Sequence, residues 1–197
     1  DTTLGASWST FLTSAEFGIS SNKAIGGKAS TWGSTVIESA RFNSDVSSAD
    51  HWAEVVISSY VSVGSGDNWI GPIARFSSSA HTGYYYAHIT RSSAGSNRLD
   101  KVVAGVMTSL SLVSASNSDG DLVTCNCSGS SISGKRNGTT QTSVTDTSIT
   151  GNTRGGLVYR SGNFAIRPLY DDFVIDDGLG GGGGGSTSGN LLLLGVG

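Results

Sequence analysis

Charged residues are scarce in this chain of 197 residues, at 14% of the sequence, and the formal net charge is −3. A nucleic-acid site needs clustered Lys and Arg to neutralise phosphates, and the 12 basic residues form no such stripe. Long apolar runs are also missing, since Leu191 to Leu194 is typical of the longest and a membrane-spanning helix needs roughly 18 residues. The sequence therefore predicts a soluble chain that neither binds nucleic acid nor spans a membrane.

Cysteine is nearly absent, and the two cysteines lie close together as Cys125-Asn126-Cys127. On a strand, residues i and i+2 point to the same face with side chains poorly directed for a mutual disulfide. We expect two half-buried thiols, and the pattern leaves their redox state open. A zinc site is not expected, because such sites use four ligands and the chain has no second cluster of Cys or His.

Methionine is rarer still, because Met107 is the only one and the chain begins at Asp1. Either proteolysis created this first residue, which would make the chain a mature processed product, or Asp1 marks the limit of a longer polypeptide. The pattern leaves both origins open.

What the chain does contain is typical of many short strands. Hydrophobic residues make up 37% of it, and there are 29 glycines but 2 prolines. Residues 50–61 alternate with a period of two, which is the period of a strand, and two further β-branched or aromatic runs follow at 70–76 and 84–89. The turn-forming residues between these runs predict three consecutive strands in a meander, with a hairpin loop at 62–72.

Other segments carry the same signals. We expect an opening strand within 1–17 that pairs with the closing strand, a strand at 35–42, and two strands at 99–105 and 107–113. Residues 117–120 and 137–138 carry the Asp-Gly and Asn-Gly signals of tight hairpins. Further strands are expected at 122–127, 132–136, 157–160, 164–167 and 173–176. No stretch shows a convincing helical stripe, so the sequence predicts an all-β antiparallel sandwich.

The order of these segments resembles the laminin-G-like or concanavalin A-like jelly roll. The resemblance rests on DHWAEVVIS, NWIGPIARFS, GYYYAHITRS, KVVAG, LVTCNCSGSSISGKRNG, TDTSITG, GGLVYRSG and YDDFVIDD, and it covers about Ala6 to Asp177. It implies a jelly-roll domain at 1–178, similar to modules found on phage virions. Strand and turn signatures specify architecture and say little about chemistry.

Catalytic patterns are missing. Jelly-roll glucanases carry their paired carboxylates on one strand as Glu-x-Asp-x-x-Glu, and the chain has only Glu16, Glu38 and Glu54 with no such string. No G-x-S-x-G elbow or matching His context for a serine nucleophile is present either. The sequence therefore predicts that the protein is not an enzyme.

Two binding sites can be proposed from residue types. Asp67, Asn68 and Trp69 combine an aromatic ring with hydrogen-bonding groups, as a sugar site does, although a Trp69 that only starts a strand and covers the sheet edge fits better. Asp171 and Asp172 could hold a structural calcium ion together with a backbone carbonyl, although an aspartate that brackets a turn is the simpler interpretation. No cofactor is expected.

The C-terminal region breaks the pattern. Six glycines at 180–185 form a linker, and an apolar run follows that consists of Leu191, Leu192, Leu193, Leu194 and Val196. Four exposed leucines would be an aggregation liability. We therefore expect 179–197 to be an assembly tail that docks on another copy of the chain or on other structural subunits.

Three functions fit these observations. The favoured one is a structural or adhesive protein on a virion surface or similar extracellular assembly, used for decoration or attachment and in contact with surface glycans. The alternative is a secreted, lectin-like carbohydrate-binding module with Trp69 at its site. A glycan hydrolase or lyase is the third. The host, the glycan and the oligomeric symmetry cannot be read from the sequence.

Overall fold

The computed structural model describes residues 2–11, 17–20, 23–25, 36–59, 68–90, 95–161 and 169–178. Every regular element in these ranges is a β-strand, and all strand pairings are antiparallel. The prediction of an all-β antiparallel sandwich is confirmed. Among these residues there is no helix with the length and apolar character needed to cross a membrane.

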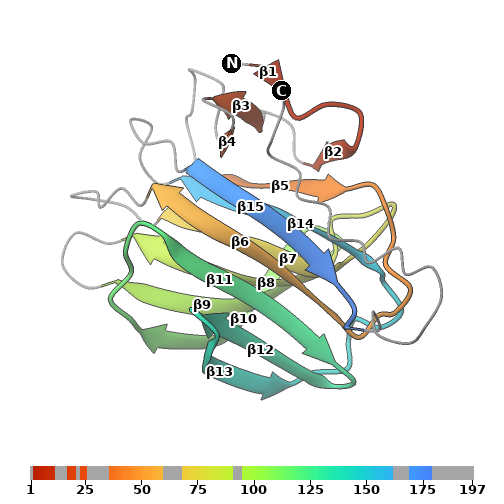
Figure 1. The fold of residues 1–197 in the computed structure, drawn as a ribbon. Helices are drawn as coiled ribbons and strands as arrows, with labels where there is room; N and C mark the ends of the chain where they lie inside the picture. The colour runs from red at the N-terminus through yellow and green to blue at the C-terminus, as the bar shows by residue number, and fades with distance from the viewer. Residues whose placement is uncertain are drawn as a thin grey trace.

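Two sheets make up the sandwich (Figure 1). The eight-stranded sheet has the order β1-β3-β4-β15-β6-β11-β12-β13. Its strands are β1 (Thr2–Thr3), β3 (Gly18–Ser20), β4 (Lys23–Ile25), β15 (Leu169–Asp176), β6 (His51–Ser59), β11 (Asp121–Ser128), β12 (Ser131–Arg136) and β13 (Thr139–Thr145).

The seven-stranded sheet has the order β10-β9-β8-β7-β14-β5-β2. Its strands are β10 (Val106–Ser114), β9 (Ser96–Val103), β8 (Gly83–Thr90), β7 (Asn68–Phe76), β14 (Arg154–Ser161), β5 (Val36–Phe42) and β2 (Trp8–Phe11). In Figure 1, β15, β6 and β11 lie in front of β7, β8 and β9. At one edge the two sheets meet, where Thr142 Oγ1 of β13 donates to Ser111 Oγ of β10 at 2.7 Å.

The main core lies between the sheets and follows from the two-residue period of the strands. On β6, Ala53, Val55 and Ile57 are fully buried while the residues between them are half-buried. They pack in one cluster with Tyr84 and Tyr86 of β8. Full burial of an aliphatic side chain the size of Val or Ile stabilises the fold by roughly 1.5–3 kcal/mol, which makes this layer the main source of stability.

A second apolar layer lies on the other face of the seven-stranded sheet, which we call the outer face. It contains Trp69, Ile73, Phe76, Tyr85, Ala87, Val102 and Val158, with Phe11 and Met107 packed against them. Tyr84, Tyr85 and Tyr86 therefore alternate between the two faces, as their spacing predicts.

Some predicted connections are wrong. The segments at 50–61 and 70–76 were expected to form a hairpin, but β6 and β7 belong to different sheets. The Asp-Gly turn at 117–120 likewise joins β10 to β11 across the sandwich, although Gly120 has the expected positive φ of 84°. The described residues within 1–17 do not pair with the closing strand, because β15 lies between β4 and β6.

The second hairpin signal is confirmed. Asn137 and Gly138 join β12 to β13 with φ values of 49° and 77°, the pair of positive φ angles that a type I′ turn requires. The strand predicted at 164–167 lies outside the described residues.

Both cysteines are free thiols on β11, and they are fully buried rather than half-buried. The reason is the position of β11 between β6 and β12, with both thiols facing the main core. Burial raises the pKa of the Cys125 thiol well above its usual value. These thiols therefore act as small apolar side chains.

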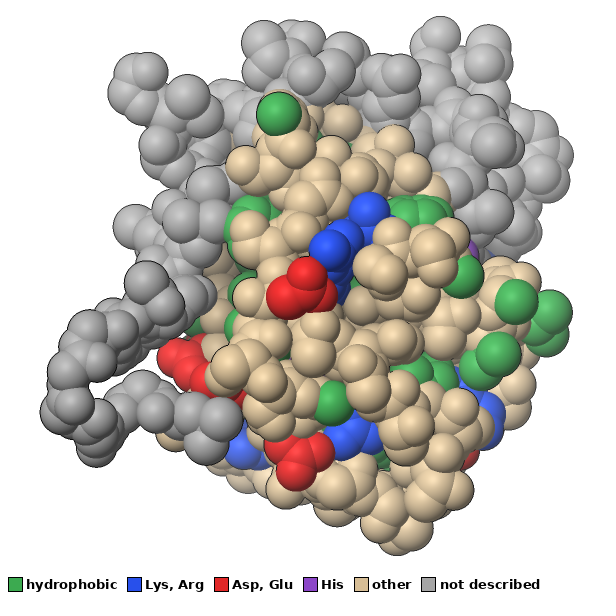
Figure 2. Space-filling view, turned by 90° about the vertical axis from the view of Figure 1, so that its right-hand side faces the viewer, with side chains coloured by type: hydrophobic (Ala, Val, Ile, Leu, Met, Phe, Trp, Pro, Cys, Tyr) green, Lys and Arg blue, Asp and Glu red, His purple; other side chains and the backbone are tan. Residues whose placement is uncertain are grey.

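The charged side chains that can be seen from the end of the sandwich are few and intermixed (Figure 2). Arg154 and Asp45 form an ion pair, with Nη2 and Oδ2 2.9 Å apart. The described part of this face therefore carries no extended patch of charge of one sign.

Candidate functional site

Polar and charged side chains share the outer face of the seven-stranded sheet with the second apolar layer. Tyr85 of β8 lies opposite Asp100 of β9, and Ala87 lies opposite Arg98. Cross-strand partners in an antiparallel sheet point to the same side, so all of these side chains face outward with Trp69. The outer face is therefore a mixed aromatic and hydrogen-bonding surface built on rigid strands.

Arg98 and Asp100 form the charged centre of this row. They are two residues apart on β9 and so share a face. The guanidinium donates from Nε to Asp100 Oδ2 and from Nη2 to Asp100 Oδ1, the latter at 2.9 Å. Asp100 is fully buried, and this two-point contact compensates its charge.

Tyr85 lies beside this pair. Its hydroxyl donates to Met107 Sδ, and the residue is fully buried. Burial, followed by the nearby charge of Asp100, raises the pKa of Tyr85 far above its usual value of 10. The phenol therefore remains protonated at any ordinary pH and can act only as a neutral hydrogen-bonding group.

Trp69 continues the row on β7. The guanidinium carbon of Arg98 lies 3.7 Å from a ring centroid of the indole, and that of Arg160 lies 3.9 Å from it. Both are cation–π distances, and Arg160 is the cross-strand partner of Trp69 on β14. The indole is 2% exposed, and its Nε1 has no hydrogen-bond partner among the described residues.

The end of the row near β2 is formed by a second cluster. Phe11 of β2 lies opposite Ser39 of β5, and the Arg41 guanidinium carbon lies 4.9 Å from the Phe11 ring centroid. His81, in the turn between β7 and β8, packs its ring against Phe76 and Phe11 at centroid distances of 5.9 and 6.5 Å. Aromatic rings and hydrogen-bonding groups therefore alternate along the whole face.

Most of this face is buried, but it opens to solvent toward β10. Ser109 lies opposite Asp100 and Leu112 lies opposite Arg98, and both β10 residues are exposed. Leu112 is 65% exposed, which is unusual for a leucine on a sheet face. A molecule in solution can therefore reach the Arg98 side chain, which is 13% exposed, from the β10 side, whereas Asp100 is fully buried.

The sugar site expected at residues 67–69 is only partly described. Asp67 lies outside the described residues, and Asn68 begins β7 without a described side chain. Trp69 is not the exposed platform that the prediction assumed, because two guanidinium groups lie against its ring. A role for these three residues in ligand binding stays a prediction.

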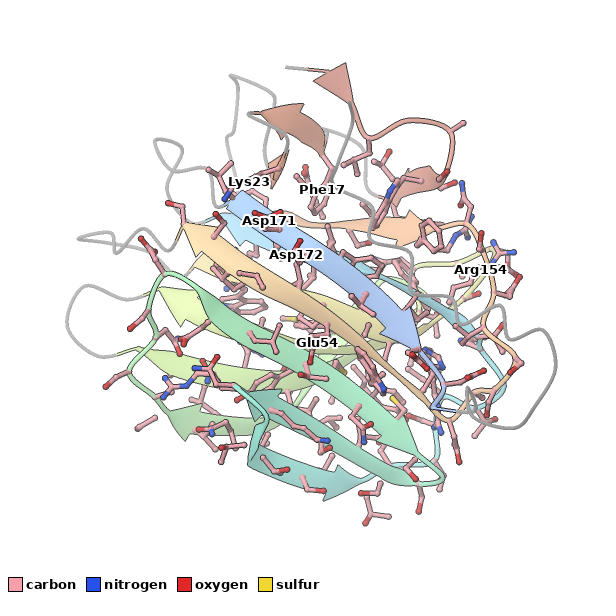
Figure 3. All side chains as sticks on the ribbon, in the orientation of Figure 1. Phe17, Lys23, Glu54, Arg154, Asp171 and Asp172 are labelled. Carbon is pink, nitrogen blue, oxygen red and sulfur yellow. The ribbon has the colours of Figure 1, made fainter. Side chains whose placement is uncertain are left out.

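The proposed calcium site near Asp171 and Asp172 has the following geometry. Lys23 Nζ forms an ion pair with Asp171 Oδ2 at 3.0 Å, and the Asp172 amide donates to Asp171 Oδ1 at 3.1 Å. These residues lie together at one end of β15, while Arg154 lies at the opposite end of the sandwich (Figure 3). The described part of the chain contains no group of three or more His, Cys, Asp or Glu arranged to hold a metal ion. The geometry fits a surface ion pair.

The apolar tail, with Leu191, Leu192, Leu193, Leu194 and Val196, lies outside the described residues. Its docking on another subunit stays a prediction, as does the boundary between the domain at 1–178 and the tail at 179–197. The same holds for an extracellular or virion location.

Sequence analysis missed Arg98, Asp100 and Tyr85. Arg98 and Asp100 did carry a readable signal, because opposite charges at i and i+2 on a strand share a face. The positions of Tyr85 and Trp69 beside Arg98 and Asp100 carried no local signal, because they depend on strand pairing between separate segments.

No protein-family model matches the chain, and no curated protein sequence matches it. Solved structures do match its fold. One is the carbohydrate-binding module CBM66 from Bacillus subtilis, with a TM-score of 0.59, 11% identity, and coverage of 86% of this chain and 94% of that one. A native glycosidic hydrolase matches with a TM-score of 0.54, 11% identity, and coverage of 86% and 89%.

A glycoside hydrolase family 16 endo-glucanase from Bacteroides ovatus, solved in complex with G4G3G-2F-DNP, also matches. Its TM-score is 0.50 at 9% identity, with coverage of 86% of this chain and 93% of that one. Identities this low show the fold alone. The chain therefore has a concanavalin A-like jelly-roll fold, and similarity to virion proteins in particular stays a prediction.

These comparisons correct one sequence-based conclusion. We inferred from the missing Glu-x-Asp-x-x-Glu string that the protein is not an enzyme, but glycoside hydrolases share its fold over 86% of the chain. At 9–11% identity a short sequence pattern need not persist where a fold does, so its absence was no ground for excluding catalysis. Of the carboxylates considered, Glu54 accepts a hydrogen bond from Thr124 Oγ1 at 2.6 Å, and Glu38 is fully buried on β5.

Proposed function

We propose that this protein binds carbohydrate on the outer face of the seven-stranded sheet. The observation that carries the proposal is the row of aromatic and hydrogen-bonding side chains on that face, built from Tyr85, Asp100, Arg98 and Trp69. Sugars present apolar C–H faces and hydroxyl groups together, so their sites combine aromatic rings with fixed polar groups. Strands hold such groups more rigidly than loops do.

The fold comparisons support the proposal without establishing it. The matching structures are a carbohydrate-binding module, a glycosidic hydrolase and a glycoside hydrolase family 16 endo-glucanase. A jelly roll can carry either activity, and function depends on the side chains of the site.

In this proposal the glycan enters from the open side of the row. Ser109 and Leu112 of β10 are exposed on the same face as Asp100 and Arg98. A glycan that lies along β9 and β10 would meet the Arg98 guanidinium, whose side chain is 13% exposed, before it meets the buried Tyr85.

Binding is tested by isothermal titration calorimetry with soluble glucan, xylan, mannan, galactan and fructan oligosaccharides. The Ser109→Tyr variant should place a bulky ring at the entrance and weaken binding by about tenfold or more, equivalent to about 1.4 kcal/mol. Thr108→Tyr is the matched control, because Thr108 is also exposed and occupies the adjacent position of β10 but points to the other side of the strand.

The control should bind as the unmodified protein does. If no oligosaccharide in the panel binds, or if both tyrosine variants lose binding equally, the proposal is wrong. Reducing ends released in the same samples report whether the bound glycan is also cleaved. Display of this domain on a virion or other extracellular assembly stays a proposal that rests on the sequence of 179–197.

A further inference from the structure

His81 has an environment that packing alone does not explain. The residue is 8% exposed and lies in the turn between β7 and β8, with its ring against Phe76 and Phe11. Both of its ring nitrogens are buried, and neither has a hydrogen-bond partner among the described residues. A buried polar group left without a partner opposes folding, so an apolar ring would be more stable here.

His51 shows what a structural buried histidine looks like in this protein. Its Nδ1 donates to the Ser48 carbonyl at 3.0 Å, and its Nε2 accepts from the Arg75 amide at 3.0 Å. Both polar atoms are used, and the neutral tautomer is fixed by its two partners. His81 is also buried, at 8% exposure against 2% for His51, but it makes neither bond.

Two more buried polar atoms without partners belong to residues that adjoin Phe11 on the outer face. They are Ser39 Oγ and Arg41 Nε, although the two terminal nitrogens of Arg41 are hydrogen-bonded to the Ser77 and Ser78 carbonyls and to Asn43 Oδ1. Ser39 is the cross-strand partner of Phe11, and the Arg41 guanidinium carbon lies 4.9 Å from the Phe11 ring centroid. Phe11, which is half-buried, is therefore adjacent to three residues that each carry an unpaired polar atom.

The unpaired donors and acceptors of His81, Ser39 and Arg41 define which kind of ligand could bind here. A neutral imidazole offers one donor and one acceptor, a hydroxyl offers both, and the Arg41 Nε offers one donor. Hydroxyl groups that donate and accept match this set, and the apolar C–H face of a sugar ring matches Phe11. An anion would instead require donors alone, because an ionised carboxylate has no proton to give to the acceptor nitrogen of His81.

We propose that Phe11, Ser39, Arg41 and His81 form a subsite that holds one sugar residue, with a ring nitrogen of His81 hydrogen-bonded to one of its hydroxyls. This subsite rests on the proposed function and extends it from the Arg98 end of the outer face to the β2 end. The two ring nitrogens of an imidazole point in nearly opposite directions, so one sugar ring reaches only one of them, and His81 selects the position of the hydroxyl that it bonds.

The test follows the ring nitrogens of the three histidines by long-range proton–nitrogen NMR, assigned through single His→Gln variants. The oligosaccharides of the calorimetric panel are added one at a time. We expect the His81 nitrogens to shift on binding while those of His51 stay in place. The His81→Phe variant should bind about tenfold more weakly or worse, with a melting temperature equal to or above that of the unmodified protein.

The two proposals can fail separately. If an oligosaccharide binds and is blocked by Ser109→Tyr, but the His81 nitrogens do not shift and His81→Phe binds normally, the subsite is wrong and the carbohydrate site on the outer face stands. If no oligosaccharide binds, both are wrong. A loss of binding in His81→Phe that is accompanied by a lower melting temperature and no shift at His81 also contradicts the subsite.

Discussion

At the scale of single residues, the two buried histidines differ in whether their ring nitrogens are hydrogen-bonded. His51 joins the turn before β6 to the β7 backbone through two hydrogen bonds, whereas His81 makes none among the described residues. The difference is energetic, because a satisfied buried group contributes to stability and an unsatisfied one opposes folding.

Replacement of each histidine by phenylalanine should therefore have opposite effects on stability. His51→Phe removes both partners and leaves the Arg75 amide and the Ser48 carbonyl unpaired, so the free energy of unfolding should fall by about 2–4 kcal/mol. His81→Phe keeps the aromatic contacts and removes an unpaired group, so stability should stay the same or rise by about 1 kcal/mol. Urea unfolding of both variants measures this, and equal losses would show that His81 is structural.

At the scale of elements, close approach between the sheets depends on a glycine in β12. A Cβ atom built on Gly134 would lie 2.1 Å from the Tyr86 ring, much closer than atoms can approach. Tyr86 is fully buried in the main core and cannot move aside without displacing its neighbours.

Gly134→Ala should consequently lower the free energy of unfolding by about 2 kcal/mol or more, because overpacking forces strain on a filled core. Ser131→Ala, at the exposed start of the same strand, is the control and should change stability by less than about 0.5 kcal/mol. Thermal unfolding of the pair measures the difference. A Gly134→Ala protein as stable as the control would mean that Tyr86 can repack.

Strands could be predicted from the sequence where one face is buried and the other is not. The alternation on β6 and the Asn137-Gly138 turn are local signals, and both are confirmed. The turn at 117–120 has similar chemistry, yet it joins two sheets instead of two neighbouring strands. Whether a turn makes a hairpin or a crossover depends on which distant strands pair, and local residues do not encode that.

The site was harder to predict for the same reason. Tyr85, Asp100 and Trp69 come from three strands, and only strand pairing places them on one face. Trp69 was singled out as an aromatic side chain near polar residues, but its burial depends on Arg98 and Arg160 from β9 and β14. The sequence shows which residue types are present, whereas the pairing of strands in the sheet determines which of them come into contact.

At the scale of the whole molecule, buried histidines should make the fold sensitive to mild acid. Burial lowers the pKa of His81 from 6.5 to about 4, and burial is also the main cause of the lowered pKa of His51. Above pH 6.5 each imidazole is neutral in both the folded and the unfolded chain. As the pH falls below that value the unfolded chain takes up protons first, so stability is lost progressively until the folded pKa is reached.

Carboxylates act in a lower pH range. The pKa of Asp45 is lowered, mainly by its hydrogen bond from Arg154, and that of Asp146 is lowered because hydrogen bonds from Lys101, Ser148 and Tyr84 outweigh its desolvation. Their stabilising contributions are present above the usual aspartate pKa and are lost only as the pH falls through the lower folded values. Above about pH 5, changes in the free energy of unfolding with pH therefore reflect the titration of the histidines.

We accordingly predict that the free energy of unfolding falls between about pH 7.5 and about pH 5, with His81 alone contributing about 2 kcal/mol of the loss. His81→Phe should remove that share, so its stability should depend less steeply on pH than that of the unmodified protein, while the share due to His51 remains. Urea unfolding at several pH values measures both slopes. Parallel curves for the two proteins would show that His81 is already accessible to protons in the folded state, and that its burial exerts no control over its charge.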